Sequence, residues 1–192
     1  MLALSCGGTS STNNTYLTQS STSTSQTCSY TVCPSGSDVC ALRIDFEEFE
    51  MTAASTTAST ATQLTKGNCD QDTLTISSPA GANPPLLCGT LTGQHLYVDA
   101  SSACHKVDAI ISSTDTSTSR KWNIKVTQIE CTNTLLPPSG CLQYYTGTTG
   151  FLYNFGWRAA TTLNGNLSIR LYVIKLILIV SRSSKYYSHE QP

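Results

Sequence analysis

Alternation of hydrophobic and polar residues is the clearest pattern in this chain. In the segment ALRIDFEEF, residues 41–49, the side chains of Leu42, Ile44 and Phe46 fall on one face of a β-strand. Glu47 and Glu48 then put Phe49 out of step, which predicts a β-bulge or the end of the strand. The same alternation recurs in DTLTIS, QHLYVD and KWNIKV, whose apolar positions are Leu74, Ile76, Leu96, Val98, Trp122, Ile124 and Val126.

These segments predict an all-β protein with the architecture of an antiparallel β-sandwich. No stretch before residue 158 sustains the spacing of an amphipathic helix. Two tracts rich in Ser and Thr, 18–27 and 52–65, are interpreted as solvated loops, the second with the composition of an O-glycosylated segment. The apolar segment 171–180 contains Lys175 and falls short of the roughly 20 apolar residues that span a membrane. Its high β propensity predicts a tendency to aggregate.

The cysteine content places the chain in an oxidising compartment. Nine cysteines among 192 residues, with 39% hydrophobic residues, are typical of a secreted domain that compensates for a modest core with disulfide bonds. The opening MLALSCGG is much shorter than the core of a signal peptide, so the extracellular location is predicted from the cysteines alone. A net charge of −1 provides no basic surface for a phosphate backbone, which argues against nucleic-acid binding.

Two sequons would make a secreted form of this chain a glycoprotein. Asn13 begins the sequon Asn13-Asn14-Thr15, and Asn166 begins a second match that ends at Ser168. Asn13 is the candidate that lies within the predicted sandwich.

Several motifs occur in an order that resembles the CUB domain family. They are CGG at Cys6, LRIDFEEFEM followed by CDQDTLTI at Cys69, and LLCGTLTGQHLYVDAS around Cys88. The segment KWNIKVTQIEC stands where the last strand of such a domain belongs, so the resemblance extends from Cys6 to Cys131. YVDAS and WNIKVTQ are more narrowly similar to secreted arthropod proteins with two CUB domains. The resemblance implies a disulfide-stapled β-sandwich of the CUB-like jelly-roll type.

The resemblance also implies two disulfide bonds, Cys6 with Cys28 and Cys69 with Cys88. Four cysteines remain before residue 132, and we expect them to pair locally. Cys33 and Cys40 flank the turn-like segment PSGSDV, and Cys104 and Cys131 flank the last two strands. The alternative, a metal site at Cys28, Cys33 and Cys40, has neither a CxxC pair nor a nearby fourth ligand.

Cys141 is left over from these four pairs. The segment GCLQYYTGTTGFLYNFGW around it resembles the opening of a second CUB domain, but no further cysteine follows. We therefore expect residues 6–132 to form a CUB-like domain and 133–157 to begin a truncated second one. Residues 158–192 are interpreted as a tail unrelated to the family.

Calcium is the only cofactor that the resemblance suggests, because many CUB domains hold it with three acidic side chains. Asp72 occupies one of these positions. Thr52 and Ala100 occupy the other two, while Glu50 and Asp99 are displaced from them by two residues and one residue. A shift of one residue turns a strand side chain to the other face, so displaced acidic residues do not make reliable ligands. We therefore expect the set Asp72, Asp99 and Glu50 to bind calcium weakly or not at all.

No hydrolase or phosphate-binding motif is present in the sequence, and His95 and His105 are interpreted as strand or loop residues rather than catalytic bases. The Tyr144-Tyr145 pair is interpreted as core or recognition aromatics. The chain is therefore predicted to be a non-enzymatic extracellular recognition or scaffold module that binds a protein or carbohydrate partner. The alternative is a regulatory CUB-containing part of a larger secreted protease.

Overall fold

The computed structural model describes residues 2–54, 68–112, 119–146, 153, 155, 169–174 and 177–182. The regular elements among these residues are β-strands, and none of the described residues belongs to a helix that could cross a membrane. The strands are β1 (Leu2–Leu4), β2 (Thr9–Ser10), β3 (Thr15–Thr22), β4 (Gln26–Val32), β5 (Val39–Glu50), β6 (Asp72–Ile76), β7 (His95–Asp99), β8 (His105–Ile111), β9 (Arg120–Glu130), β10 (Cys141–Thr146), β11 (Ile169–Ile174) and β12 (Ile177–Arg182).

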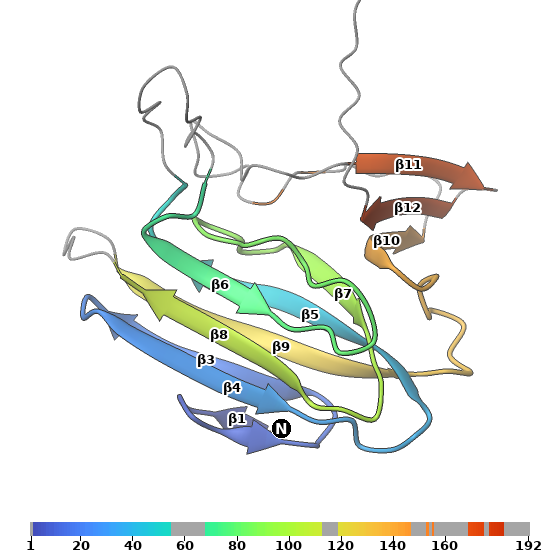
Figure 1. Cartoon of the computed structure of the whole chain (residues 1–192), viewed down its shortest axis with the longest axis horizontal. Helices are drawn as coiled ribbons and strands as arrows, with labels where there is room; N and C mark the ends of the chain where they lie inside the picture. Colours follow the sequence, from blue (N-terminus) through green and yellow to red (C-terminus); the bar gives the residue numbers. More distant parts are fainter. Residues whose placement is uncertain are drawn as a thin grey trace, which may run out of the picture.

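Two sheets stack face to face and enclose one core (Figure 1). One has the strand order β1-β3-β9-β5-β7, and the other has the order β2-β4-β8-β6. The all-β sandwich is therefore the architecture that the sequence predicts. Its pairs are antiparallel except at the N-terminus, where β1 runs parallel to β3 and β2 runs parallel to β4. Gly7, with a φ of 83°, lies between β1 and β2, which belong to different sheets.

The first tract rich in Ser and Thr, residues 18–27, is not the solvated loop that its composition suggested. It contributes to β3 and β4, which are antiparallel partners of β9 and β8. Threonine is β-branched and suits a pleated strand, and Leu17 and Tyr30 anchor the two strands in the core. The second tract, 52–65, lies mostly outside the described residues, and its first three residues are not in a strand.

The predicted bulge in β5 is present. The register of β5 against β9 shifts between Phe46 and Glu48, so Phe46 and Phe49 both point into the core. Their ring centroids are 5.3 Å apart, and Phe49 lies 6.4 Å from the ring of Trp122. Trp122 in β9 donates a hydrogen bond of 3.0 Å to the hydroxyl of Tyr30 in the opposite sheet. Apolar packing and this hydrogen bond therefore join the two sheets at the same place.

The chain after β9 also contacts the sandwich. Leu142 and Phe155 belong to the same core cluster as the two sheets, with exposed fractions of 3% and 1%. β10 packs against β7, and Nε2 of Gln143 donates to the carbonyl of His95 at 3.3 Å. β10 also pairs antiparallel with β12, which in turn pairs with β11 (Figure 1). The division into a domain of residues 6–132, the start of a second one at 133–157 and a tail at 158–192 stays a prediction.

We predict that the segment around β10 contributes to the stability of the sandwich. Leu142→Ala should lower the free energy of unfolding by about 2–5 kcal/mol, because it leaves a cavity beside packed side chains. Leu86→Ala is the matched control, since Leu86 is 54% exposed and its removal opens no cavity. Denaturant unfolding of the oxidised proteins measures both. Equal stability of the two variants would mean that residues after β9 do not support the core.

Candidate binding site

Four disulfide bonds connect eight of the nine cysteines. Two of them, Cys6–Cys28 and Cys69–Cys88, are the bonds implied by the resemblance. The expectation for the other four cysteines is wrong. The structure contains the bonds Cys33–Cys104 and Cys40–Cys131 in place of Cys33–Cys40 and Cys104–Cys131.

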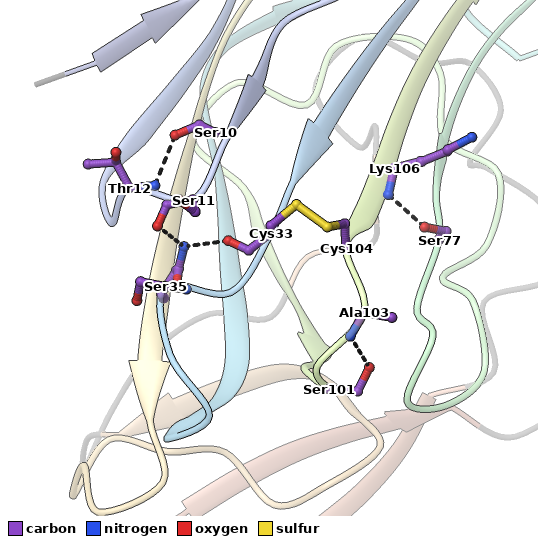
Figure 2. The surroundings of a disulfide bond; sticks show 11 residues. Ser10, Ser11, Thr12, Cys33, Ser35, Ser77, Ser101, Ala103, Cys104 and Lys106 are labelled. Atoms are coloured by element: carbon purple, nitrogen blue, oxygen red, sulfur yellow. Dashed lines mark hydrogen bonds between the residues drawn. A yellow bond between two sulfur atoms is a disulfide. The ribbon is translucent and has the colours of Figure 1, made fainter.

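Strand register explains the first correction. β4 and β8 are antiparallel neighbours in which Val32 lies opposite His105. Cys33 directly follows β4 and Cys104 directly precedes β8, so the two cysteines face each other with Cα atoms 4.0 Å apart (Figure 2). The expectation that cysteines close in sequence pair with each other missed this bond, because antiparallel strands bring together residues that are distant in the chain.

The second correction has the same cause in the other sheet. Val39 in β5 lies opposite Glu130 in β9, and the register shifts between Val39 and Ala41, so Cys40 is an extra residue at the start of β5. The backbone N–H of Cys131 donates to the carbonyl of Asp38 at 2.8 Å, and the Cα atoms of Cys40 and Cys131 are 4.9 Å apart. Each of the two stacked sheets has one disulfide that joins two hydrogen-bonded neighbours at their ends. Cys141 is not part of these four bonds; its side chain is buried and its backbone N–H donates to the carbonyl of Pro138 at 3.1 Å.

Asp72, the candidate calcium ligand in the best-matched position, forms an ion pair inside the protein. Nε of Arg120 lies 2.9 Å from Oδ2 of Asp72, and neither side chain is exposed. The backbone N–H and hydroxyl of Thr52 also donate to Oδ2, at 3.0 and 2.5 Å, and Nη2 of Arg120 donates to the Thr52 hydroxyl at 3.0 Å. The chain itself therefore provides the positive charge that compensates Asp72.

Arg120 was not among the predicted site residues, although the sequence contains a signal for it. It has the same parity along β9 as Trp122, Ile124 and Val126, which all face the core. A charged residue on the buried face of a strand requires a partner of opposite charge. Asp72 at the start of β6 is that partner, and the pair links the two sheets.

The other two candidate calcium ligands are not near one another. Asp99 is opposite Ala41 near the start of β5, whereas Glu50 ends that strand, so they are separated by roughly 30 Å of strand. Asp99 accepts hydrogen bonds from the backbone of Gly140 and from the Ser139 hydroxyl, at 2.9 and 3.1 Å. Within the described part of the chain, no group of three His, Cys, Asp or Glu side chains could hold a metal ion.

The sequon residue Asn13 is held by β9. Its Oδ1 accepts from the backbone N–H of Gln128 at 2.8 Å, and its Nδ2 donates to the carbonyl of the same residue at 3.3 Å. Asn13 thereby pairs with Gln128 as a neighbouring strand residue would. The glycosylation of Asn13 stays a prediction. The second sequon, at Asn166, lies outside the described residues.

A cavity of about 560 Å³ lies on the outer face of the five-stranded sheet. Its floor consists of side chains that alternate with the core residues of β5, β7 and β9, and the loop after β9 forms one wall. Its volume is within the range of small-ligand sites, which is about 300–1,000 Å³. The residues that matter most for its chemistry are Arg43, Asp45, His95, Lys125, Ile129 and Leu135. We define this feature as the outer-face cavity.

Arg43 and Asp45 form the polar centre of the outer-face cavity. Nε and Nη2 of Arg43 donate to Oδ1 of Asp45 at 2.9 and 2.8 Å. Nη1 donates to the hydroxyl of Tyr97 at 3.2 Å, and the guanidinium carbon lies 5.7 Å from the centre of the Tyr97 ring. Residues two apart on a strand share a face, so the alternation in ALRIDFEEF could have placed Arg43 and Asp45 together outside the core.

Aromatic side chains support this centre from β7 and β10. His95 packs edge to face against Tyr97 and Tyr145, with centroid distances of 5.5 and 5.0 Å. Burial lowers the pKa of the His95 imidazole, and the positive charge of Arg43 lowers it further. A neutral imidazole at physiological pH avoids placing a second cation beside Arg43. Tyr144 packs against Tyr97 at 6.4 Å, so the Tyr144-Tyr145 pair contributes to the outer face of the sandwich.

Burial also lowers the pKa of the His105 imidazole, which is 1% exposed. Its Nδ1 lies 2.9 Å from the carbonyl of Ser77, and its Nε2 has no hydrogen-bond partner among the described residues. His105 is a strand residue in β8, as predicted, and it is separated from the outer-face cavity by belonging to the other sheet.

A comparison with protein-family models and with curated protein sequences gives no match. Among solved structures, the full extracellular region of zebrafish Gpr126/Adgrg6 is similar over 66% of this chain and 15% of that one, with 18% identity and a TM-score of 0.48. The CUB1-EGF-CUB2 domains of rat MASP-1 are similar over 66% of this chain and 42% of that one, with 7% identity and a TM-score of 0.45. This chain thus covers less than half of either structure.

We predict that peptide mapping under non-reducing conditions will recover the bonds Cys33–Cys104 and Cys40–Cys131. Each joins two antiparallel neighbours, so loss of either bond should cost about 2–4 kcal/mol through the larger freedom of the unfolded chain. Paired Cys→Ser variants measure that cost. A peptide that links Cys33 to Cys40 would contradict the register of both sheets.

A second prediction concerns the buried ion pair. Arg120→Met should lower the free energy of unfolding by about 3–5 kcal/mol, because it leaves the Asp72 carboxylate buried without its cation. The double variant Asp72→Leu, Arg120→Met should recover part of this loss. Lys121→Met is the control, since the Lys121–Glu48 pair is exposed and its removal should change stability little. Equal losses for Arg120→Met and Lys121→Met would refute the role of the buried pair.

Proposed function

We propose that this chain is a non-enzymatic extracellular recognition module with a CUB-like sandwich that binds a protein or carbohydrate partner. The outer-face cavity is the observation that carries the proposal. Its floor consists of side chains from three adjacent strands, and one of those strands is tied to its neighbour by the disulfide Cys40–Cys131. Sites on strands hold their side chains more firmly than sites on loops, which favours recognition without rearrangement.

Two further observations support this proposal. Four disulfide bonds are typical of proteins that fold and act in an oxidising environment. Neither candidate base is hydrogen-bonded to a nucleophile among the described residues: the backbone of Tyr144 bonds His95, the carbonyl of Ser77 bonds His105, and Nε2 of both rings is buried without a hydrogen-bond partner. A general base must instead reach a nucleophile or substrate proton.

The proposal is tested with the full chain produced through a secretory pathway. Alkylation of the native protein should leave the eight disulfide cysteines unmodified. In a binding assay, the chain carrying a detection label should bind saturably to an array of extracellular proteins and glycans. Reduction should abolish that binding, because the strand ends lose their ties. Alkylation of all the cysteines in freshly secreted protein, or the absence of saturable binding, would overturn the proposal.

A further inference from the structure

We propose that the outer-face cavity is a binding site for a neutral saccharide. The inference rests on the proposed function and specifies both its site and the chemistry of its ligand. Three properties of the cavity carry it: a fixed donor–acceptor pair, a balance of charge and an aliphatic wall.

The donor–acceptor pair is formed by Arg43 and Asp45. The guanidinium has five N–H groups, and its bonds to Asp45 and Tyr97 leave two terminal N–H groups that point away from them. Each Asp45 carboxylate oxygen can accept a further hydrogen bond. The side chains of Arg43 and Asp45 are 40% and 26% exposed, so both are accessible. Adjacent hydroxyls of a sugar match this pair, since one can accept from Arg43 while the next donates to Asp45.

The charges that line the cavity balance one another. Arg43 and Lys125 are positive, Asp45 and Glu47 are negative, and Lys125 lies opposite Asp45 in the register of β9 and β5. A site with no net charge gives no advantage to a phosphorylated, sulfated or strongly basic ligand. A neutral ligand with many hydroxyl groups fits this arrangement because it uses each charge as a strong hydrogen-bond partner.

The aliphatic wall comes from Ile129 and Leu135. Leu135 lies in the loop after β9 and lines the cavity. Its side chain is large and hydrophobic, and the residue is 57% exposed. Its backbone N–H donates to Oδ1 of Asn133 at 2.8 Å, which fixes the local turn of this loop. A sugar ring has one face of C–H groups, and that face can cover Leu135 while the ring hydroxyls bind the polar floor.

The surroundings disfavour an extended peptide as the ligand. A peptide strand would add to the edge of the five-stranded sheet at β7, but β10 packs there and Gln143 already donates to the carbonyl of His95. The floor of the cavity also includes the charged side chains of Arg43, Asp45 and Lys125, which do not suit the apolar face of an amphipathic helix.

The test uses an array of neutral hexose and N-acetylhexosamine oligosaccharides beside sulfated and sialylated ones, with the full chain as the probe. We expect binding to neutral oligosaccharides, with a loss of at least about tenfold in affinity for Arg43→Gln and for Asp45→Asn, since each removes charge-assisted hydrogen bonds. Glu48→Gln is the matched control. Glu48 in β5 and Lys121 in β9 form an ion pair, and neither residue lines the cavity.

Thermal unfolding of each variant shows whether the fold is intact, and titration with a free neutral oligosaccharide gives the affinities. Unchanged binding by folded Arg43→Gln and Asp45→Asn variants would overturn the site. Binding restricted to sulfated or sialylated glycans would overturn the ligand class. Saturable binding to an extracellular protein alone would refute the saccharide and leave the proposed recognition function standing.

Discussion

The register of β5 between β9 and β7 determines both faces of the five-stranded sheet. The extra residue at the bulge allows Phe46 and Phe49 to face the core together, whereas strict alternation would turn Phe49 outward. Upstream of the bulge, the same register directs Arg43 and Asp45 to the outer face. The core and the outer-face cavity therefore depend on one alignment, and the Cys40–Cys131 bond ties β5 to the end of β9 at the beginning of the strand.

Strand positions could be predicted from the sequence wherever apolar residues alternate. The inward positions of β5, β6, β7 and β9 are buried as their alternation predicts. The polar tract 18–27 gave no such signal, because the core residues of β3 and β4, which are Leu17, Cys28, Tyr30 and Val32, all lie outside the tract. Backbone pairing with β9 and β8 gives these residues their strand conformation, and such long-range pairing is not recorded in local composition.

The same limit applies to the cysteines and to the candidate site. Cys33 and Cys104 are 71 residues apart in sequence, and only the pairing of β4 with β8 brings them together. Asp72 could be singled out from its motif, but its chemistry depends on Arg120, which approaches from the opposite sheet. The parity of Arg120 along β9 could have predicted that it is buried. Its partner could not be predicted in this way, because parity specifies a face and not the residue across the core.

The two ion pairs on the outer face of the sheet differ in how well they are prepared for a ligand. Arg43 is held by Asp45 on its own strand, by the Tyr97 hydroxyl and by the Tyr97 ring, so its guanidinium is already oriented. Lys121 contacts Glu48 at 2.6 Å, and this single contact orients its long side chain less, although Lys121 and Arg43 are similarly exposed, at 38% and 40%. A ligand that binds Arg43 therefore loses less side-chain entropy than one that must first order Lys121. This difference in preorganisation, at similar charge, is the physical reason to place recognition at the cavity rather than at the exposed pair.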